Sequence, residues 1–208
     1  MHVVFCPTVT RGEEHYGHAL LSRYPIDIVK RARLAHDPKS WWQEPRSAIW
    51  ARVDVDGHLI NVITTHLGLG PRERVLQLKD LLGDDWIGGI PTDEPIIICG
   101  DFNALPGSAP YKLAASRLRD VQSPLGGHRP LGTFSSLQPL VRLDHIFTST
   151  HFQRQRVLVV RNDLTRVASD HLPLVADLRI GPADVDTSTR THPQSAMRTP
   201  AELPLELR

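Results

Sequence analysis

Four short segments of the chain combine residues that can bind a cation or move a proton, and each is expected where a β-strand ends. They are Thr65-His66-Leu67, Gly100-Asp101-Phe102-Asn103, Leu143-Asp144-His145-Ile146-Phe147 and Ser169-Asp170-His171-Leu172-Pro173. Taken singly, such a segment is usually a solvated turn, because proton-transfer and ligand roles are a minority use of histidine. Taken together, the segments supply the parts that hydrolysis of a phosphate ester needs.

The chemistry that these residues favour is a cation-assisted attack of water on phosphorus. The carboxylates of Asp101 and Asp170 suit Mg²⁺, or alternatively Mn²⁺, which is usually held by one or two carboxylates plus substrate phosphate oxygens. A histidine beside a carboxylate can deprotonate the water, and a second histidine or an amide can stabilise the phosphoryl oxygens or the leaving group. No Cys or His cluster has zinc-finger spacing, although a catalytic zinc bound by His and Asp stays open.

The pattern of the chain predicts an α/β domain that positions these segments. Two β-rich runs flank Asp56-Gly57, so residues 49–65 are predicted to form an antiparallel hairpin that ends next to His66. A helix is predicted over 71–82, because Pro71 favours a helix start and the apolar residues recur at helical spacing. Its apolar face consists of Val75, Leu78 and Leu82.

Further elements complete the predicted order. They are strands at 1–7, 95–99, 140–147, 156–160 and 174–180, a short helix with a loop at 108–121, and a long surface connection at 123–139. The run 95–99 is apolar throughout, which is typical of a strand covered on both faces. It places Asp101 at the carboxyl end of a central strand.

The composition predicts one folded domain over residues 1–180, followed by a disordered tail at 181–208. The tail is rich in Pro, Ser and Thr and has no periodic apolar face. The 24 Lys and Arg balance 23 Asp and Glu, so the net charge of +1 gives no footprint for a polyanion. Tight binding of duplex DNA is therefore less favoured than binding of a small phosphate ester.

Other composition signals exclude several classes of protein. The chain contains no run of about 18 consecutive apolar residues, so no membrane span is predicted. Residues 1–7 lack the basic segment of a secretory signal, so a soluble protein with a cytoplasmic location is expected. Cys6 and Cys99 give no sign of a disulfide framework.

The ordered motifs resemble the endonuclease/exonuclease/phosphatase superfamily, the Mg²⁺-dependent group that includes DNase I-like nucleases and neutral sphingomyelinases. The match covers about residues 3–178. Gly100–Asn103 and Ser169–Pro173 are its specific motifs, whereas Thr65–Leu67 and Tyr16–Arg23 add less. The resemblance implies a four-layered α/β sandwich with two mixed β-sheets back to back, whose loops converge on one edge.

The resemblance also implies a role for each matching residue near the cation. Asp101 and Asn103 would contact the attacking water and the scissile phosphate, with Asp101 close to the metal. Asp170 would be a second carboxylate on the metal side.

The two predicted catalytic histidines take different roles in the same resemblance. His171 would be the general base or a phosphate stabiliser, oriented by Asp144. His66 would donate a hydrogen bond to the phosphate or protonate the leaving group. His145 would point to the opposite face of its strand from Asp144 and is expected to be structural.

The sequence departs from the family pattern at its beginning. Family members carry an Asn on the first strand and a metal-binding Glu shortly after the second. Both positions lie upstream of the part of the family pattern that matches this sequence from Met1 on. Glu13 and Glu14 do not match that Glu, so the domain is expected to be N-terminally truncated. His18 stands where the family usually has Asn. The chain is either a fragment of a longer protein or a short form with weakened or absent catalysis.

Two functions follow from these observations. The first is a divalent-metal-dependent phosphoesterase whose substrate is a phosphodiester or phosphomonoester of a small molecule, a lipid head group or a nucleic acid. The alternative is a catalytically impaired fragment or pseudoenzyme that acts as a binding module. No obligate protein partner is indicated. Arg46 stays outside the predicted site, because surface arginines before a strand rarely contact a substrate.

Overall fold

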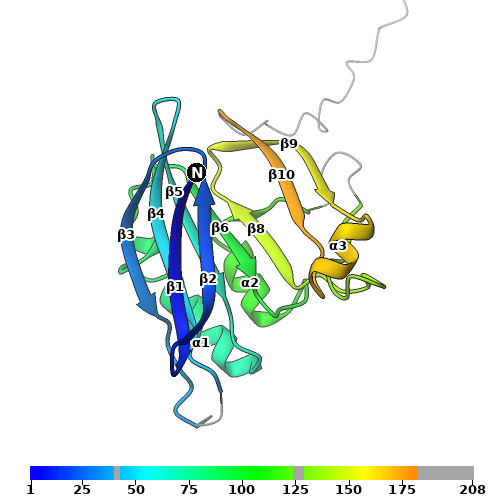
Figure 1. The fold of residues 1–208 in the computed structure, drawn as a ribbon. Helices are drawn as coiled ribbons and strands as arrows, with labels where there is room; N and C mark the ends of the chain where they lie inside the picture. Colours follow the sequence, from blue (N-terminus) through cyan, green and yellow to red (C-terminus); the bar gives the residue numbers. More distant parts are fainter. Residues whose placement is uncertain (40–42, 124–128, 182–208) are drawn as a thin grey trace, which may run out of the picture.

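A mixed six-stranded β-sheet forms the centre of the molecule, in a computed structural model that describes residues 1–39, 43–123 and 129–181 (Figure 1). The strand order is β3-β4-β5-β6-β8-β7. The strands are β3 (Ile26–Arg33), β4 (Ser47–Val55), β5 (His58–His66), β6 (Ile96–Asp101), β7 (Arg119–Asp120) and β8 (Asp144–Thr148). Only β5 and β6 run parallel, whereas the other neighbouring pairs of this sheet are antiparallel. From residue 182 on, the predicted tail lies outside the described residues.

The hairpin of β4 and β5 forms as the sequence predicts. Asp56 and Gly57 have φ angles of 53° and 86°, the left-handed conformations that a tight two-residue turn requires. The Gly57 amide donates to the Asp54 side chain at 2.8 Å. The predicted strand at 95–99 is also confirmed, as β6.

Two helices cover one face of the sheet, α1 (Pro71–Leu81) and α2 (Ala109–Ala115), and a 3-10 turn, η1 (Ile87–Gly89), lies between them in sequence. The largest hydrophobic cluster fills the space between these elements and the sheet. It includes Trp50, Ile63, Leu78, Leu81, Trp86, Ile98, Phe102, Ala114 and Phe147. Both predicted helices are therefore confirmed, and the core lies behind the strands that carry the chemistry-bearing segments.

The buried face of α1 differs from the predicted one. Leu78 is fully buried as expected, but Val75 and Leu82 are only half-buried. Glu73 and Gln77 face inward instead. The segment after His66 needs a hydrogen-bond acceptor for its backbone, and the Gly68 amide donates to Gln77 Oε1 at 2.8 Å.

Two separate antiparallel pairs cover the other face of the sheet. They are β1 (His2–Arg11) with β2 (Glu14–Ser22), and β9 (Phe152–Val159) with β10 (Leu174–Ile180), the latter joined through α3 (Asp163–Ala168). Val4 and Cys6 of the first pair pack on Ile49 and Ala51 of β4, and β10 contacts β8. The layers confirm the predicted α/β sandwich around a mixed sheet.

This second strand layer corrects one detail, since the resemblance implies a second mixed sheet. Within the described residues, each pair hydrogen-bonds only to its own sequence neighbour and neither pair joins the other. Strand bounds also shift, because β8 begins at Asp144 rather than at 140 and β9 spans Phe152–Val159 rather than 156–160.

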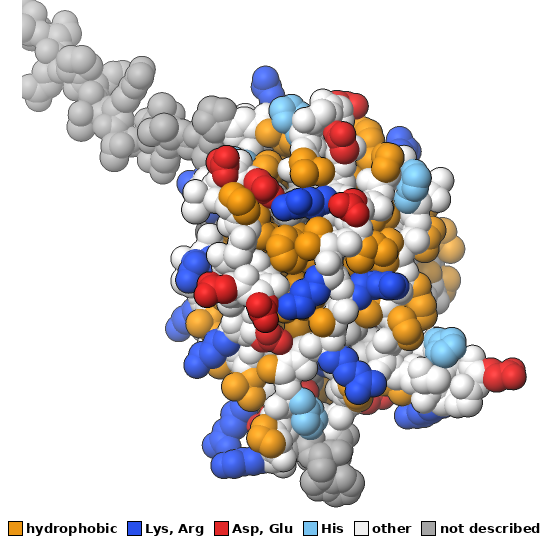
Figure 2. All heavy atoms as spheres, turned by 90° about the vertical axis from the view of Figure 1, so that its left-hand side faces the viewer, with side chains coloured by type: hydrophobic (Ala, Val, Ile, Leu, Met, Phe, Trp, Pro, Cys, Tyr) orange, Lys and Arg blue, Asp and Glu red, His pale blue; other side chains and the backbone are white. Residues whose placement is uncertain are grey.

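Three remaining expectations concern cysteines, membranes and charge. Cys6 and Cys99 are both free thiols. Among the described helices, none has the length and apolar character needed to cross a bilayer. On the side of the molecule that carries β3, basic, acidic and hydrophobic side chains are interspersed (Figure 2), in keeping with the net charge of +1.

Candidate active site

Three strand ends meet at one edge of the central sheet. The register pairs His66 at the end of β5 with Asp101 at the end of β6, and Asp101 with Asp144 at the start of β8. Gly100 makes this approach feasible, because its φ is 142° and a Cβ there would lie 1.9 Å from the Thr65 carbonyl oxygen. The predicted convergence of these strand ends is confirmed.

Asp101 lies at the centre of the group. Its Oδ2 is 3.3 Å from His66 Nε2 and 3.9 Å from His171 Nε2, and its Oδ1 accepts a hydrogen bond from the Asn103 amide at 2.8 Å. Burial raises the pKa of Asp101, and the charge of Asp144 acts in the same direction against that hydrogen bond. A further positive charge at this place would therefore stabilise the ionised carboxylate of Asp101.

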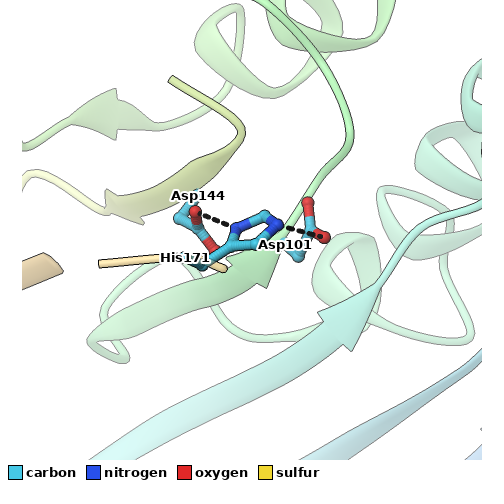
Figure 3. A group of neighbouring side chains, drawn as sticks. All are labelled: Asp101, Asp144 and His171. Carbon is cyan, nitrogen blue, oxygen red and sulfur yellow. Dashed lines mark hydrogen bonds and ion pairs between the residues drawn. The ribbon is translucent and has the colours of Figure 1, made fainter. Parts of the chain in front are cut away.

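His171 forms a dyad with Asp144, as Figure 3 shows. Nδ1 of His171 lies 2.7 Å from Asp144 Oδ2, and because an ionised carboxylate only accepts, the imidazole donates from Nδ1. Nε2 then carries the lone pair and faces Asp101. Burial acts to lower the pKa of His171, but the hydrogen bond and charge of Asp144, with the charge of Asp101, raise it overall.

The loop that the sequence predicts as a long surface connection holds this dyad in place. Thr133 is fully buried. Its Oγ1 accepts from the Asp144 amide at 3.3 Å, and its carbonyl accepts from the Leu172 amide at 2.7 Å. The ring of Phe134 lies 5.0 Å from the ring of His171. One short segment thus ties both members of the dyad to the same frame.

His66 has a cation as its other neighbour. Arg46 Nη1 lies 3.4 Å from His66 Nδ1. Burial, and after it the charge of Arg46, lowers the pKa of His66 to about 4. His66 is therefore a neutral imidazole at neutral pH, which supports a hydrogen-bond donor rather than a protonated acid.

The site fits a divalent cation that prefers oxygen ligands. Asp101, Asp144 and His171 each offer a ligand atom, and these atoms lie within 4.8 Å of one another. Since Nδ1 of His171 is already engaged by Asp144, the carboxylates are the donors that Mg²⁺ would favour.

Two further predicted residues, Asn103 and Asp170, lie outside the group formed by Asp101, Asp144 and His171. Asn103 donates from Nδ2 to the Leu67 carbonyl at 2.9 Å, so its amide holds the segment that follows His66. Asp170 is exposed and does not belong to the group of three ligand residues. The roles assigned to both residues toward water, phosphate and metal stay predictions.

His145 is a buried structural residue, as expected. It has no exposed surface, and its Nε2 donates to the Ala104 carbonyl at 2.8 Å. Burial lowers its pKa, so the ring is neutral among its aromatic neighbours Phe102, Tyr111 and Phe147.

Sequence reasoning missed Arg46 as a neighbour of the site. Its position before a strand that pairs antiparallel with the strand ending at His66 is the signal that could have found it. His18 of β2 also lies near enough for its charge to influence His66. Neither position belongs to one of the four segments. The pairing of β4 with β5 brings Arg46 to this edge, and the packing of β2 against β5 brings His18 there.

Comparisons with known proteins place this geometry in a family. A model of the endonuclease/exonuclease/phosphatase family matches residues 2–171. The uncharacterized protein YbhP of Escherichia coli K12 is 32% identical over 171 residues, which cover 81% of this chain and 64% of YbhP. The chain thus spans less than two thirds of the length of the curated relatives it matches.

Solved structures show the same fold. The catalytic domain of human Nocturnin, solved with a bound sulfate anion, is 25% identical with a TM-score of 0.66, over 86% of this chain and 72% of that one. A mannosyl-6-phosphatase from Bacteroides thetaiotaomicron is 20% identical with a TM-score of 0.66, over 86% and 77%. A functionally unknown protein from Enterococcus faecalis has 20% identity and a TM-score of 0.69, again over 86% and 77%. These likenesses confirm the DNase I-like fold.

Proposed function

Because the chain belongs to the endonuclease/exonuclease/phosphatase family, we propose that it is a divalent-metal-dependent phosphoesterase that hydrolyses a phosphodiester or a phosphomonoester with water. One observation carries the proposal, the carboxylate of Asp101 flanked by the Nε2 atoms of two imidazoles at 3.3 and 3.9 Å. The mannosyl-6-phosphatase of the same fold and the sulfate held by Nocturnin, a tetrahedral anion like phosphate, agree with this chemistry.

In this proposal His171 is the general base. Asp144 accepts a hydrogen bond from the Nδ1–H group of His171. The lone pair of Nε2 is therefore free on the side where Asp101 lies. The raised pKa of His171 makes it a better acceptor for the proton of the attacking water. Asp144 orients the ring and stabilises its protonated form.

His66 supplies the complementary group. With its pKa lowered to about 4, it stays neutral and donates a hydrogen bond from Nε2 to a phosphoryl or leaving-group oxygen. Asp101 and Asp144, with the predicted Asp170, would hold the cation. When bound, the cation offsets the negative charge that develops on the phosphate.

The surroundings favour a small organic leaving group. A surface hollow of about 610 Å³ is lined by Val9, Arg11, Glu14, His15, Tyr16 and Glu44, none of which belongs to the group around Asp101. Glu44 connects it to the site, because its Oε2 is 3.7 Å from Arg46 Nη2. The lining combines one aromatic ring with charges of both signs, which suits a polar group better than a duplex of uniform negative charge.

The test is hydrolysis of two chromogenic substrates, bis(p-nitrophenyl) phosphate and p-nitrophenyl phosphate, with Mg²⁺ or Mn²⁺. We expect release of p-nitrophenol that EDTA abolishes and added metal restores. Asp101→Asn should remove this activity, whereas Asp93→Asn, at an exposed carboxylate on a loop, should keep it.

Two results would contradict the proposal. Hydrolysis that is indifferent to EDTA would exclude the metal. A folded chain that hydrolyses neither substrate with either cation would exclude the enzyme as given and favour the binding module.

A further inference from the structure

Arg46 is a buried cation placed against one side of His66. It immediately precedes β4, whose first residues pair with the last residues of β5, Ala48 with Thr65. Its carbonyl accepts a hydrogen bond from the Leu34 amide at 2.8 Å, and the residue is only 8% exposed. Arginine is seldom buried this far without a defined partner. The backbone and the packing therefore hold the guanidinium beside the end of β5.

The contact between the two side chains restricts where the proton of His66 can lie. A guanidinium has only donors, and Nη1 of Arg46 lies 3.4 Å from Nδ1 of His66. Nδ1 must therefore be the acceptor, which leaves the ring proton on Nε2. That atom faces the acceptor oxygen Oδ2 of Asp101 at 3.3 Å. The other tautomer would set donor against donor at Nδ1 and acceptor against acceptor at Nε2.

The opposite arrangement holds for His171, which serves as an internal reference. There the partner of Nδ1 is the carboxylate of Asp144, so the proton lies on Nδ1 and the lone pair on Nε2. The two imidazoles therefore present opposite groups toward Asp101, an N–H from His66 and a lone pair from His171. A cation on one ring and an anion on the other produce the difference.

Carboxylates around Arg46 keep its charge in place. Glu44 Oε2 lies 3.7 Å from Nη2, and the charge of Arg46 also acts on the buried carboxyl of Glu73. The guanidinium thus contacts the Glu44 carboxylate through Nη2 and the His66 imidazole through Nη1. This arrangement fixes the direction in which its donors point.

We propose that Arg46 is a positioning residue, which holds His66 in the tautomer that carries its proton on Nε2 and aims this N–H at the reacting side of the site. Its catalytic consequence rests on the proposed function, since the N–H is then ready to donate to a phosphoryl or leaving-group oxygen. The tautomer itself is a property of the folded chain and needs no substrate.

The first test is the ¹⁵N spectrum of the histidine side chains in the metal-free chain at pH 7.5. In the wild type we expect a protonated Nε2 and an unprotonated Nδ1 for His66, with the reverse for His171. Arg46→Met, which keeps the length without the donors, should turn the His66 signals into those of a tautomer mixture. Arg46→Lys, which restores a donor and a charge, should return them toward the wild type.

The second test is kinetic. With p-nitrophenyl phosphate esters and Mg²⁺, Arg46→Met should lower kcat by about 10–100-fold at a nearly constant KM, as is usual for a residue that orients another, and Arg46→Lys should recover part of it. Arg52→Met is the matched control, because Arg52 lies half-buried on β4, the strand that Arg46 precedes, with Glu94 and Asn61 as partners. It should leave both kcat and the His66 signals unchanged.

The outcomes separate this proposal from the proposed function. A wild-type His66 with its proton on Nδ1 overturns the proposal even if Arg46→Met fails to fold, and so does a folded Arg46→Met with unchanged His66 signals. A rise in KM alone overturns it as well, because the guanidinium would then bind the substrate. If the chain hydrolyses no ester, the proposed function fails while the ¹⁵N spectra still decide the tautomer.

Discussion

The two sides of Asp101 carry the same kind of side chain in opposite chemical states. His66, from the end of β5, is neutral with a pKa lowered to about 4, first by burial and then by the charge of Arg46. His171, from the segment before β10, has its pKa raised by Asp144 and Asp101 against the effect of burial. The comparison teaches that the partner of Nδ1, rather than the imidazole itself, decides which ring can donate and which can accept.

The two sides also differ in how the backbone supports them. His66 lies in a strand of the central sheet, with its register set by β4 and β6. His171 lies in a connection and depends on the loop that contains Thr133 and Phe134. His66 is therefore held by strand pairing in the central sheet, and His171 by contacts between loops.

The largest effect is expected from Asp144→Asn, which changes the partner of His171. An amide in place of the carboxylate no longer requires a proton on Nδ1 of His171, so the base loses its tautomer and its raised pKa. We expect kcat to fall by about 10⁴-fold, the size known for an equivalent change in a protease triad, with KM nearly constant. Asp177→Asn, at an exposed carboxylate paired with Arg156, is the control. A loss smaller than tenfold would remove the base role from His171.

A smaller loss should follow on the other side. His66→Ala removes the Nε2 donor, and kcat should fall by about 10²–10³-fold, the usual cost of one transition-state hydrogen bond. His66→Gln keeps an N–H donor without an imidazole and should retain more activity than His66→Ala. Equal losses in the two variants, measured as kcat on the same ester, would show that His66 does more than donate a hydrogen bond.

A third histidine lies near Asp101 and Asp144 in sequence and strand pairing but contacts neither carboxylate in the described structure. His145 is fully buried and has a lowered pKa, so it binds fewer protons folded than unfolded. The free energy of unfolding should therefore be highest above the unfolded pKa of about 6.5 and fall as the pH drops below it.

The size of this effect is set by one proton. Between pH 7.5 and 5.5 His145 should therefore contribute a loss in the free energy of unfolding, measured by urea unfolding. His145→Gln should remove this contribution and reduce the difference between the two pH values, while the contributions of His18, His66 and His171 remain in both proteins. An unchanged difference would contradict the assignment.

The sequence predicts the central frame well because its signals are local. Asp56-Gly57 marks the hairpin, Pro71 marks the start of α1, and the apolar run before Cys99 marks β6. These elements suffice to place His66 and Asp101 side by side at strand ends.

The rest depends on pairings that no local pattern contains. Arg46 becomes a buried neighbour of His66 only through the register of β4 with β5 and the bond to Leu34. Glu73 and Gln77 look like a solvated helix face, yet they turn inward because the segment after His66 needs polar partners. Thr133 shows no sign in the sequence of its role in holding Asp144.

The absence of a side chain at Gly100 sets the width of the whole arrangement. Since a methyl group there would collide with the Thr65 carbonyl, it would act as a wedge between the two parallel strands. His66 would move away from Asp101 with every reacting atom still present. The close approach of the two backbones thus sets the distance between His66 and Asp101. Alanine at position 100 would disable the site although every catalytic side chain would still be present.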